Sequence, residues 1–268
     1  MTHSVFFDGI AQREIPIRQY QGWAPLFFQE ASLYAAVFLA DARAAQTLLP
    51  TPQHRLLKPF PGKALIAFHC FEYRQSQLGA YSEVSISLAM HFGTQPRLSP
   101  LRLARSVLQR AYHAYVLQLP VDSEPALFGG LDYYNVPKYL ADLSFEQIKG
   151  GQSVEVFSRA DPSKNAGGQL IFRLQMPELK TKSIPQRDRA SLSTMELNTY
   201  PLIDGKTHCA SGSLNLIQHG GQFFPRKVEL SLGDDPMAEQ LKGLKIGRAL
   251  QSLYVPSCQL ILDLPRRM

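Results

Sequence analysis

The sequence has few of the features that mark secreted, membrane-spanning or metal-binding proteins. Only three of its 268 residues are cysteines, and they form no CxxC pair, so neither a disulfide framework nor a zinc site is indicated. No apolar stretch approaches the roughly 18 residues of a membrane-spanning helix. The N-terminus also lacks the basic region and the apolar run of a signal peptide. We therefore expect a cytoplasmic protein with no membrane partner.

The short motifs of several large enzyme classes are also absent. The chain has no HExxH, no GxSxG, no Walker loop and no GxGxxG. Its seven histidines are scattered, and no two of them lie three or four positions apart. The sequence thus indicates no metal and no cofactor. The net charge of +6 would permit binding of nucleic acid. Because no RNP motif or basic-aromatic array is present, we expect no nucleic-acid partner.

What is present is an ordinary globular composition, 45% hydrophobic and 19% charged, with many strand-like segments. Residues 63–73 and 81–92 have the apolar patterns of strands, with a turn at 77–80. An apolar run from residue 30 predicts a strand, followed by a short helix for which Asp41 is a suitable N-cap. Predicted strands outnumber predicted helices by roughly three to one. These patterns predict one β-rich α+β domain over 1–268, with a closed or nearly closed sheet that leaves few free edges.

The clearest predicted helix spans Pro100 to Tyr115. Its apolar residues form one stripe and its basic residues lie on the opposite side. Such a helix is typical of a surface helix that lies on a core, and a contact with a partner or another subunit is the alternative.

The segment 131–140, Leu-Asp-Tyr-Tyr-Asn-Val-Pro-Lys-Tyr-Leu, places Lys138 directly after a proline and among aromatic residues. Proline restricts the backbone, so the lysine extends from a stiff segment. Apolar surroundings remove hydration from an ammonium and favour the free amine, which can attack a carbonyl carbon and form a Schiff base. Alternatively, Lys138 extends into solvent from a turn, as most lysines do.

Three segments in this order and spacing resemble the acetoacetate decarboxylase family. They are Phe38-Leu39-Ala40-Asp41 running to Leu48-Leu49-Pro50, Leu78-Gly79-Ala80-Tyr81-Ser82-Glu83, and Asn135-Val136-Pro137-Lys138-Tyr139-Leu140. The tail 241–264, with Leu253-Tyr254-Val255-Pro256, is also similar to the C-terminal end of the family. The resemblance implies a closed or cone-like antiparallel β barrel with a surrounding sheet and a few helices. Residues 95–113 have no counterpart that we can place and would form an extra helical segment.

The resemblance implies the chemistry of the site. Lys138 would be the nucleophile that condenses with a β-keto acid, and the iminium would accept electrons as carbon dioxide leaves. Glu83 would position or protonate the reacting carbon. No cofactor is implied, the substrate is a small carbonyl compound, and members associate into homo-oligomers.

The sequence departs from the family at several positions. Where members carry a second lysine, the chain has Tyr139, and Leu39 replaces an arginine that binds the substrate carboxylate. In an ungapped alignment a second glutamate falls on Phe68, and an Arg-Glu pair is replaced by Leu131-Asp132. We expect the pocket to contain Leu39, Phe68, Tyr81, Asp132 and Tyr139. Asp132 is either a general base or the cap of a turn.

The departures leave two hypotheses open. A less charged pocket disfavours acetoacetate itself, because a buried carboxylate needs a partner. The first hypothesis is a Schiff-base-forming lyase that acts on a different keto acid or another carbonyl compound, by decarboxylation or by aldol and dehydration chemistry. The second is a non-catalytic protein that keeps the fold and binds a small molecule.

Overall fold

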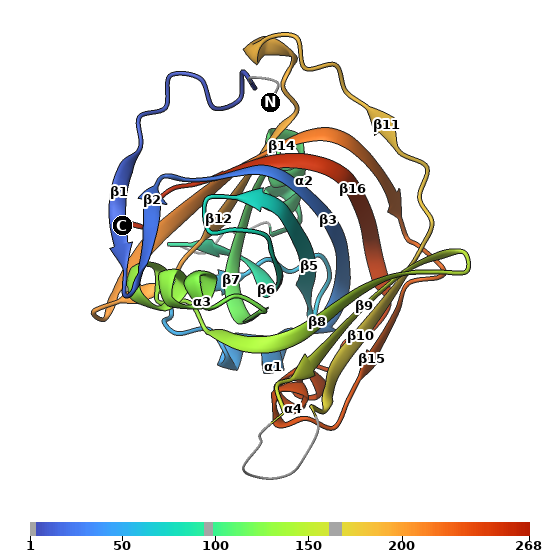
Figure 1. Ribbon diagram of the computed structural model, residues 1–268. Helices are drawn as coiled ribbons and strands as arrows, with labels where there is room; N and C mark the ends of the chain where they lie inside the picture. Colours follow the sequence, from blue (N-terminus) through green and yellow to red (C-terminus); the bar gives the residue numbers. More distant parts are fainter. Residues whose placement is uncertain (1–3, 94–98, 161–167) are drawn as a thin grey trace.

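Seven strands of the chain close into a barrel (Figure 1). The computed structural model describes residues 4–93, 99–160 and 168–268. Around the barrel the strand order is β7-β12-β14-β16-β3-β5-β6, and β6 pairs again with β7 to close it. The fold is therefore the β-rich α+β barrel that the sequence predicted. The barrel strands are β3 (Leu26–Asp41), β5 (Lys63–Ser76), β6 (Tyr81–Phe92), β7 (Ala111–Val121), β12 (Thr194–Thr199), β14 (Lys206–Phe223) and β16 (Ala249–Leu262).

Local sequence signals account for the first part of the barrel. Strand β3 ends at Asp41, whose side chain accepts a hydrogen bond from the Ala44 amide at 2.9 Å and caps helix α1 (Ala42–Thr47), as predicted. The predicted hairpin of β5 and β6 is confirmed, and Tyr73 pairs with Tyr81 across it. Gly79 in its turn has a φ of +89°, a conformation that other residues rarely adopt.

The barrel is mixed, and in this detail the prediction of an antiparallel barrel was wrong. Strand β12 runs parallel to β7, and β7 also pairs in parallel with β8 (Lys138–Ile148). Parallel neighbours need a crossover connection rather than a tight hairpin. Between β7 and β8 this connection is helix α3 (Glu124–Gly129) and a π-helical turn, η1 (Gly130–Tyr134).

An outer sheet continues from β7 and folds over one side of the barrel (Figure 1). Its remaining strands are β9 (Gly151–Ser158), β10 (Leu170–Pro177) and β15 (Glu229–Leu232), and helix α4 (Pro236–Gly243) contacts β10 and β15. One hydrophobic core joins residues of the barrel and of the outer sheet, including Phe68 and Phe172, whose ring centroids are 5.3 Å apart. A second core is made by barrel residues that include Phe28, Phe71 and Leu214.

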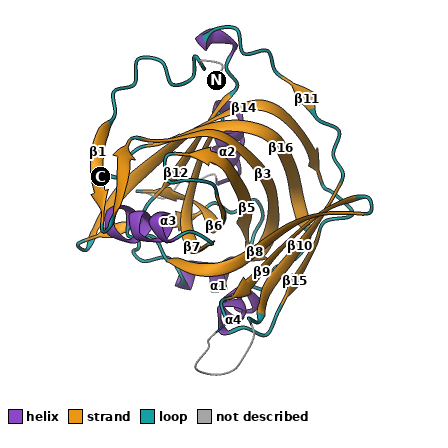
Figure 2. Ribbon diagram, in the orientation of Figure 1, coloured by secondary structure: helices purple, strands orange, loops and turns teal. Residues whose placement is uncertain are grey.

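The other elements are short and lie around the barrel (Figure 2). The N-terminal hairpin of β1 (Arg13–Ile17) and β2 (Tyr20–Ala24) lies beside α3 at one end of the barrel (Figure 2). The remaining segments are β4 (His54–Leu56), α2 (Ser99–Gln109), β11 (Lys182–Ser183), η3 (Arg189–Ser191), β13 (Leu202–Ile203) and β17 (Arg266–Arg267).

Helix α2 differs from the helix that the sequence predicted. It ends at Gln109, and Tyr115 belongs to strand β7, because β6 and β12 both pair with this stretch of the chain. Its apolar stripe does not lie on a core, since Leu101 is 63% exposed and Leu108 is 84% exposed. Residues 95–98 of the predicted extra segment lie outside the described residues.

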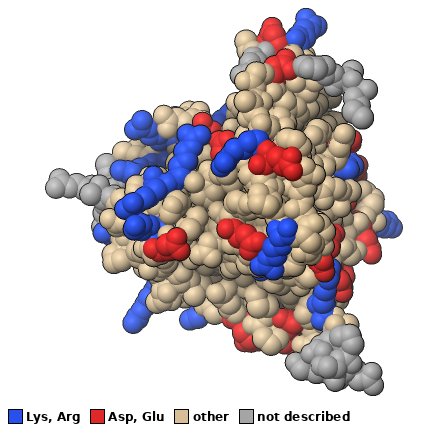
Figure 3. Space-filling model, turned by 60° about the vertical axis from the view of Figure 1, so that its left-hand side comes forward, with Lys and Arg blue, Asp and Glu red and all other residues tan. Residues whose placement is uncertain are grey.

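On the face drawn in Figure 3, Lys and Arg side chains gather on the left-hand part, and charged side chains of both signs are interspersed over the rest. Within the described ranges, no helix is both long enough and apolar enough to cross a membrane.

Candidate active site

A cavity of about 180 Å³ lies where the barrel interior meets α3 and the β1–β2 hairpin. Its wall is mostly apolar and aromatic, and it is built from both hairpin strands, all seven barrel strands and the β7–β8 connection. Representative side chains are those of Ile17, Phe28, Phe71, Leu119, Tyr134 and Leu260. Such a wall favours the binding of an apolar group.

Lys138 enters this cavity from the first position of β8. Its backbone is held tightly: the Lys138 amide donates to the Val136 carbonyl at 2.7 Å, and the Pro137 carbonyl accepts from the Leu119 amide at 3.1 Å. Adjacent residues of a strand point to opposite faces, so Lys138 points into the cavity while Tyr139 points away from it. The stiff segment that the sequence indicated therefore fixes the position of the Lys138 backbone, from which the side chain extends.

A glycine provides the space for the lysine side chain. A Cβ atom added at Gly130 would lie 2.3 Å from Lys138 Cδ and 3.1 Å from Cε, well inside the usual contact distance. Gly130 has a φ of −66°, which every residue can adopt, so the close approach of Lys138 is what favours glycine here. The absence of a side chain at Gly130 thus leaves room for the lysine stem.

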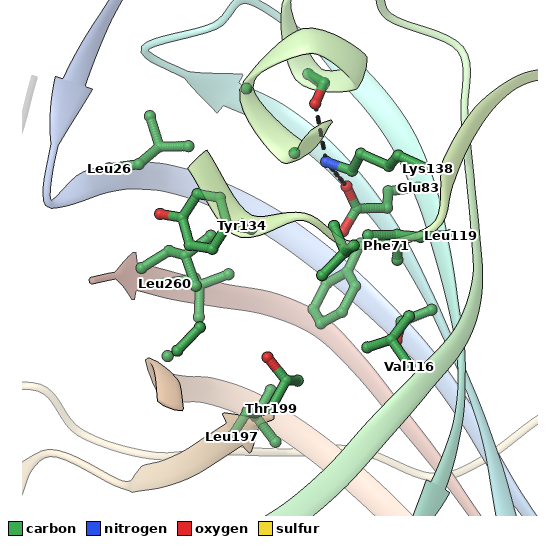
Figure 4. Close-up of a pocket in the computed structure, with 18 of the residues that line it drawn as sticks. Leu26, Phe71, Glu83, Val116, Leu119, Tyr134, Lys138, Leu197, Thr199 and Leu260 are labelled. Atoms are coloured by element: carbon green, nitrogen blue, oxygen red, sulfur yellow. Dashed lines mark hydrogen bonds and ion pairs between the residues drawn. The ribbon is translucent and has the colours of Figure 1, made fainter. Parts of the chain in front are cut away.

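The ammonium of Lys138 meets one carboxylate and one carbonyl (Figure 4). Its Nζ lies 2.8 Å from Glu83 Oε2 and donates a hydrogen bond to the Ala126 carbonyl oxygen at 3.1 Å. The side chains of Lys138 and Glu83 are only 9% and 12% exposed. Their contact is an ion pair without hydrogen-bond geometry, and Glu83 Oε2 accepts no hydrogen bond from any described residue. The two opposite charges compensate each other, and Oε2 is the carboxylate oxygen in contact with the lysine.

His69 is a cavity residue that sequence reasoning missed. In the β5–β6 hairpin Phe71 lies opposite Glu83, and His69 lies opposite Ser85. His69 and Glu83 are therefore diagonal neighbours on one face of the sheet, about 7–8 Å apart at their Cα atoms. Burial lowers the pKa of His69 to about 4, so its imidazole is neutral at neutral pH.

The remaining titratable side chains of the cavity are uncharged tyrosines. Burial raises the pKa of Tyr73 and of Tyr81 well above the usual value, and the nearby Glu83 carboxylate raises both further. Within the described part of the wall, Lys138 and Glu83 are consequently the two residues that form an ion pair.

Three of the seven predicted site residues line the cavity together, namely Lys138, Glu83 and Tyr81. The other four do not. Phe68 is fully buried in the core shared with the outer sheet, and Tyr139 packs against the same core and donates to Gln118 Oε1 at 3.1 Å. Both belong to the opposite face of their strands, because moving one position along a strand reverses the face.

Leu39 and Asp132 are also outside the cavity wall. Leu39 lies near the end of β3, where its amide donates to the Arg248 carbonyl at 3.2 Å. Asp132 accepts two hydrogen bonds from the Arg18 guanidinium at 3.0 Å, at the surface of the β1–β2 hairpin. The alternation of His69, Phe71 and Tyr73, set against Tyr81 and Glu83, was the signal that could have identified His69.

The comparisons with known proteins agree with this architecture. A sequence model described as Acetoacetate decarboxylase (ADC) matches residues 14–263. No curated protein sequence matches the chain. The structure is similar to the acetoacetate decarboxylase of Legionella pneumophila, with a TM-score of 0.63, 14% identity, and coverage of 91% of this chain and 87% of that one.

Two further structures are similar over the same share of this chain. One is the enduracididine biosynthesis enzyme MppR complexed with pyruvate, with a TM-score of 0.59, 12% identity and 90% of that chain covered. The other is an acetoacetate decarboxylase-like enzyme from Sphingomonas wittichii, with a TM-score of 0.54, 15% identity and 93% of that chain covered. At these identities the likeness concerns the fold. Together with the family match over nearly the whole sequence, it shows that the chain belongs to the acetoacetate decarboxylase family.

Proposed function

We propose that the protein is a lyase that forms a Schiff base between Lys138 and a carbonyl substrate. The observation that carries this proposal is the buried Lys138 amine, 2.8 Å from Glu83 Oε2 at the wall of an apolar cavity. Family membership supports it. A relative of the same fold, MppR, has also been solved with the condensation product of pyruvate and an aldehyde, so a carbonyl compound binds to that protein.

Glu83 is placed to activate the lysine. An ammonium cannot attack a carbonyl carbon, so Lys138 must first lose a proton, and Glu83 Oε2 is the acceptor within reach. The amine then adds to the carbonyl carbon and forms the new C–N bond of a carbinolamine. Return of the proton from Glu83 allows the carbinolamine hydroxyl to leave as water, and the product is a cationic iminium on Lys138.

The iminium then accepts an electron pair. When a bond to the neighbouring carbon breaks, its electrons become the C=C bond of an enamine, and the former iminium nitrogen becomes neutral. A proton adds to the enamine carbon, and water hydrolyses the regenerated iminium to release the product and the lysine amine. The mostly apolar wall limits competing contact with water at this stage.

Reductive trapping tests the proposal. The protein would be incubated with a panel of ketones, aldehydes and keto acids, reduced with borohydride, and analysed by intact mass and peptide mapping, beside Lys138→Ala. We expect a reduced adduct on Lys138 that is lost in Lys138→Ala. A folded protein that gives no adduct with any carbonyl compound would instead favour the non-catalytic binding protein, for which Lys138→Ala leaves ligand affinity nearly intact.

A further inference from the structure

The described wall of the cavity around Lys138 contains no uncompensated cation that could pair with a substrate carboxylate. Within the described part of the wall, Lys138 is the one positive charge, and Glu83 already compensates it at 2.8 Å. No described arginine lines the cavity, and His69 is a neutral imidazole at neutral pH. The cavity therefore starts with a net charge of zero before any ligand binds.

Schiff-base formation does not change this balance. The ammonium of Lys138 is replaced by an iminium of the same charge, and one water molecule leaves. With an uncharged ketone or aldehyde the site stays neutral throughout. A keto acid adds one negative charge beside the Glu83 carboxylate, in a mostly apolar wall, where an unpaired charge is strongly unfavourable. A keto acid would thus have to bind together with a proton.

The size and wall of the cavity indicate what the rest of the substrate is. A dry apolar cavity of about 150 Å³ accepts benzene. This cavity is of similar size, about 180 Å³, and aromatic and aliphatic side chains such as Phe71, Leu197 and Leu260 line it. Its hydrogen-bonding groups include Thr199 and Asn198 as well as the neutral tyrosines, and all of these are uncharged.

The geometry points to an uncharged ketone or aldehyde with an apolar body of about one aromatic ring as the substrate of Lys138, in place of the keto acids that the family resemblance implies. This inference rests on the proposed function, because it concerns the compound that the Lys138 amine attacks. It assigns the apolar wall the role of holding the body of the substrate, and it assigns the Lys138–Glu83 pair the role of holding the carbonyl group alone.

Matched carbonyl pairs test the inference. Benzylacetone and benzylpyruvate differ only in a methyl group in place of a carboxylate, and acetone and pyruvate are the corresponding pair without the aromatic ring. Borohydride trapping rates on the protein are divided by the rates for a free lysine derivative, which removes the intrinsic reactivity of each compound. We expect benzylacetone to exceed both benzylpyruvate and acetone by about tenfold or more, which corresponds to about 1.4 kcal/mol.

Two outcomes separate this inference from the proposed function. If benzylpyruvate or pyruvate gives the highest normalised rate of adduct on Lys138, the substrate class is wrong and Schiff-base formation stands. If no compound gives an adduct on the folded protein, both proposals fail.

An added cation provides a matched control. Thr199 is half-buried and lies across the cavity from Lys138 (Figure 4). Thr199→Lys should raise the rate for benzylpyruvate relative to benzylacetone by about tenfold, whereas Thr199→Met, of similar length and uncharged, should not. An unchanged ratio in a folded Thr199→Lys protein would overturn the charge argument.

Discussion

Replacing Gly130 by alanine tests whether the close approach of Gly130 to the Lys138 side chain positions the Lys138 amine. The added Cβ would lie 2.3 Å from Lys138 Cδ, whereas carbon atoms in contact prefer about 3.5–4.0 Å. The lysine stem must therefore move by more than about 1 Å. The Nζ contact with Glu83, which is 2.8 Å, and the hydrogen bond to the Ala126 carbonyl would be lost or lengthened. Because a displacement of about 1 Å can cost about a hundredfold in rate, we expect a loss of that order.

The assay is the rate of borohydride trapping on Lys138, measured beside thermal unfolding. Gly130 has a helical φ of −66°, so alanine introduces no backbone strain and gains up to about 1 kcal/mol from the less flexible unfolded chain. Any loss of stability would therefore come from the displaced ion pair, and trapping should fall in variant protein that is still folded at the assay temperature.

The neighbouring glycine is the matched comparison. Gly129 also has a helical φ, −57°, but a Cβ there would meet Ile17 Cδ1 at 3.3 Å and no atom of Lys138. Gly129→Ala should therefore retain most of the trapping rate. If Gly130→Ala traps within about threefold of the native protein, or if both variants lose the activity equally, the positioning role of Gly130 is refuted.

Three further predictions concern charged and titratable groups. Glu83→Gln keeps the shape of the side chain and removes the proton acceptor. The trapping rate on Lys138 should therefore fall by about a hundredfold or more at neutral pH. A near-native rate in folded protein would exclude Glu83 as the base. The pKa of His69 is about 4 in the folded protein and about 6.5 when unfolded, so between these values the unfolded chain binds more protons and the unfolding free energy falls as the pH falls. His69→Phe should reduce this fall, measured by denaturant unfolding from about pH 7 to about pH 4, by at most about 3 kcal/mol, and an unchanged pH dependence would contradict a neutral His69 in the folded protein. Asp132→Ala breaks only the surface pair with Arg18, so it should leave both stability and trapping close to those of the native protein; loss of trapping would restore Asp132 as a general base.

Where a local pattern was decisive, the sequence predicted the structure well. The Asp41 cap, the β5–β6 hairpin and the stiff segment before Lys138 each depend on a few adjacent residues whose backbone preferences agree. Family resemblance led us to expect Lys138 and Glu83 in one site, but their ion pair was not predicted, since neither residue alone indicates the other across the barrel.

One error in the predicted site arose because a shift of one position along a strand moves a side chain from one face of the sheet to the other. The alignment placed Phe68 in the pocket, but in β5 that position faces the core shared with the outer sheet, and His69 lines the cavity instead. The predicted helix was too long for a different reason. Its last turn has helical periodicity, but Ala111 to Ala114 pair with β12 and Tyr115 pairs with Leu88 of β6, which holds this stretch in a strand.

The sequence by itself therefore determined a β-rich barrel and a proline-stiffened lysine, because strand periodicity, turn residues and caps act over short stretches of chain. Only the tertiary structure decided which side chains share the cavity. It paired the charge of Lys138 with that of Glu83, placed Gly130 against the lysine stem, and left Leu39 and Asp132 outside. Such contacts join segments far apart in the chain, and they form only when the barrel closes and the β7–β8 connection packs across its end.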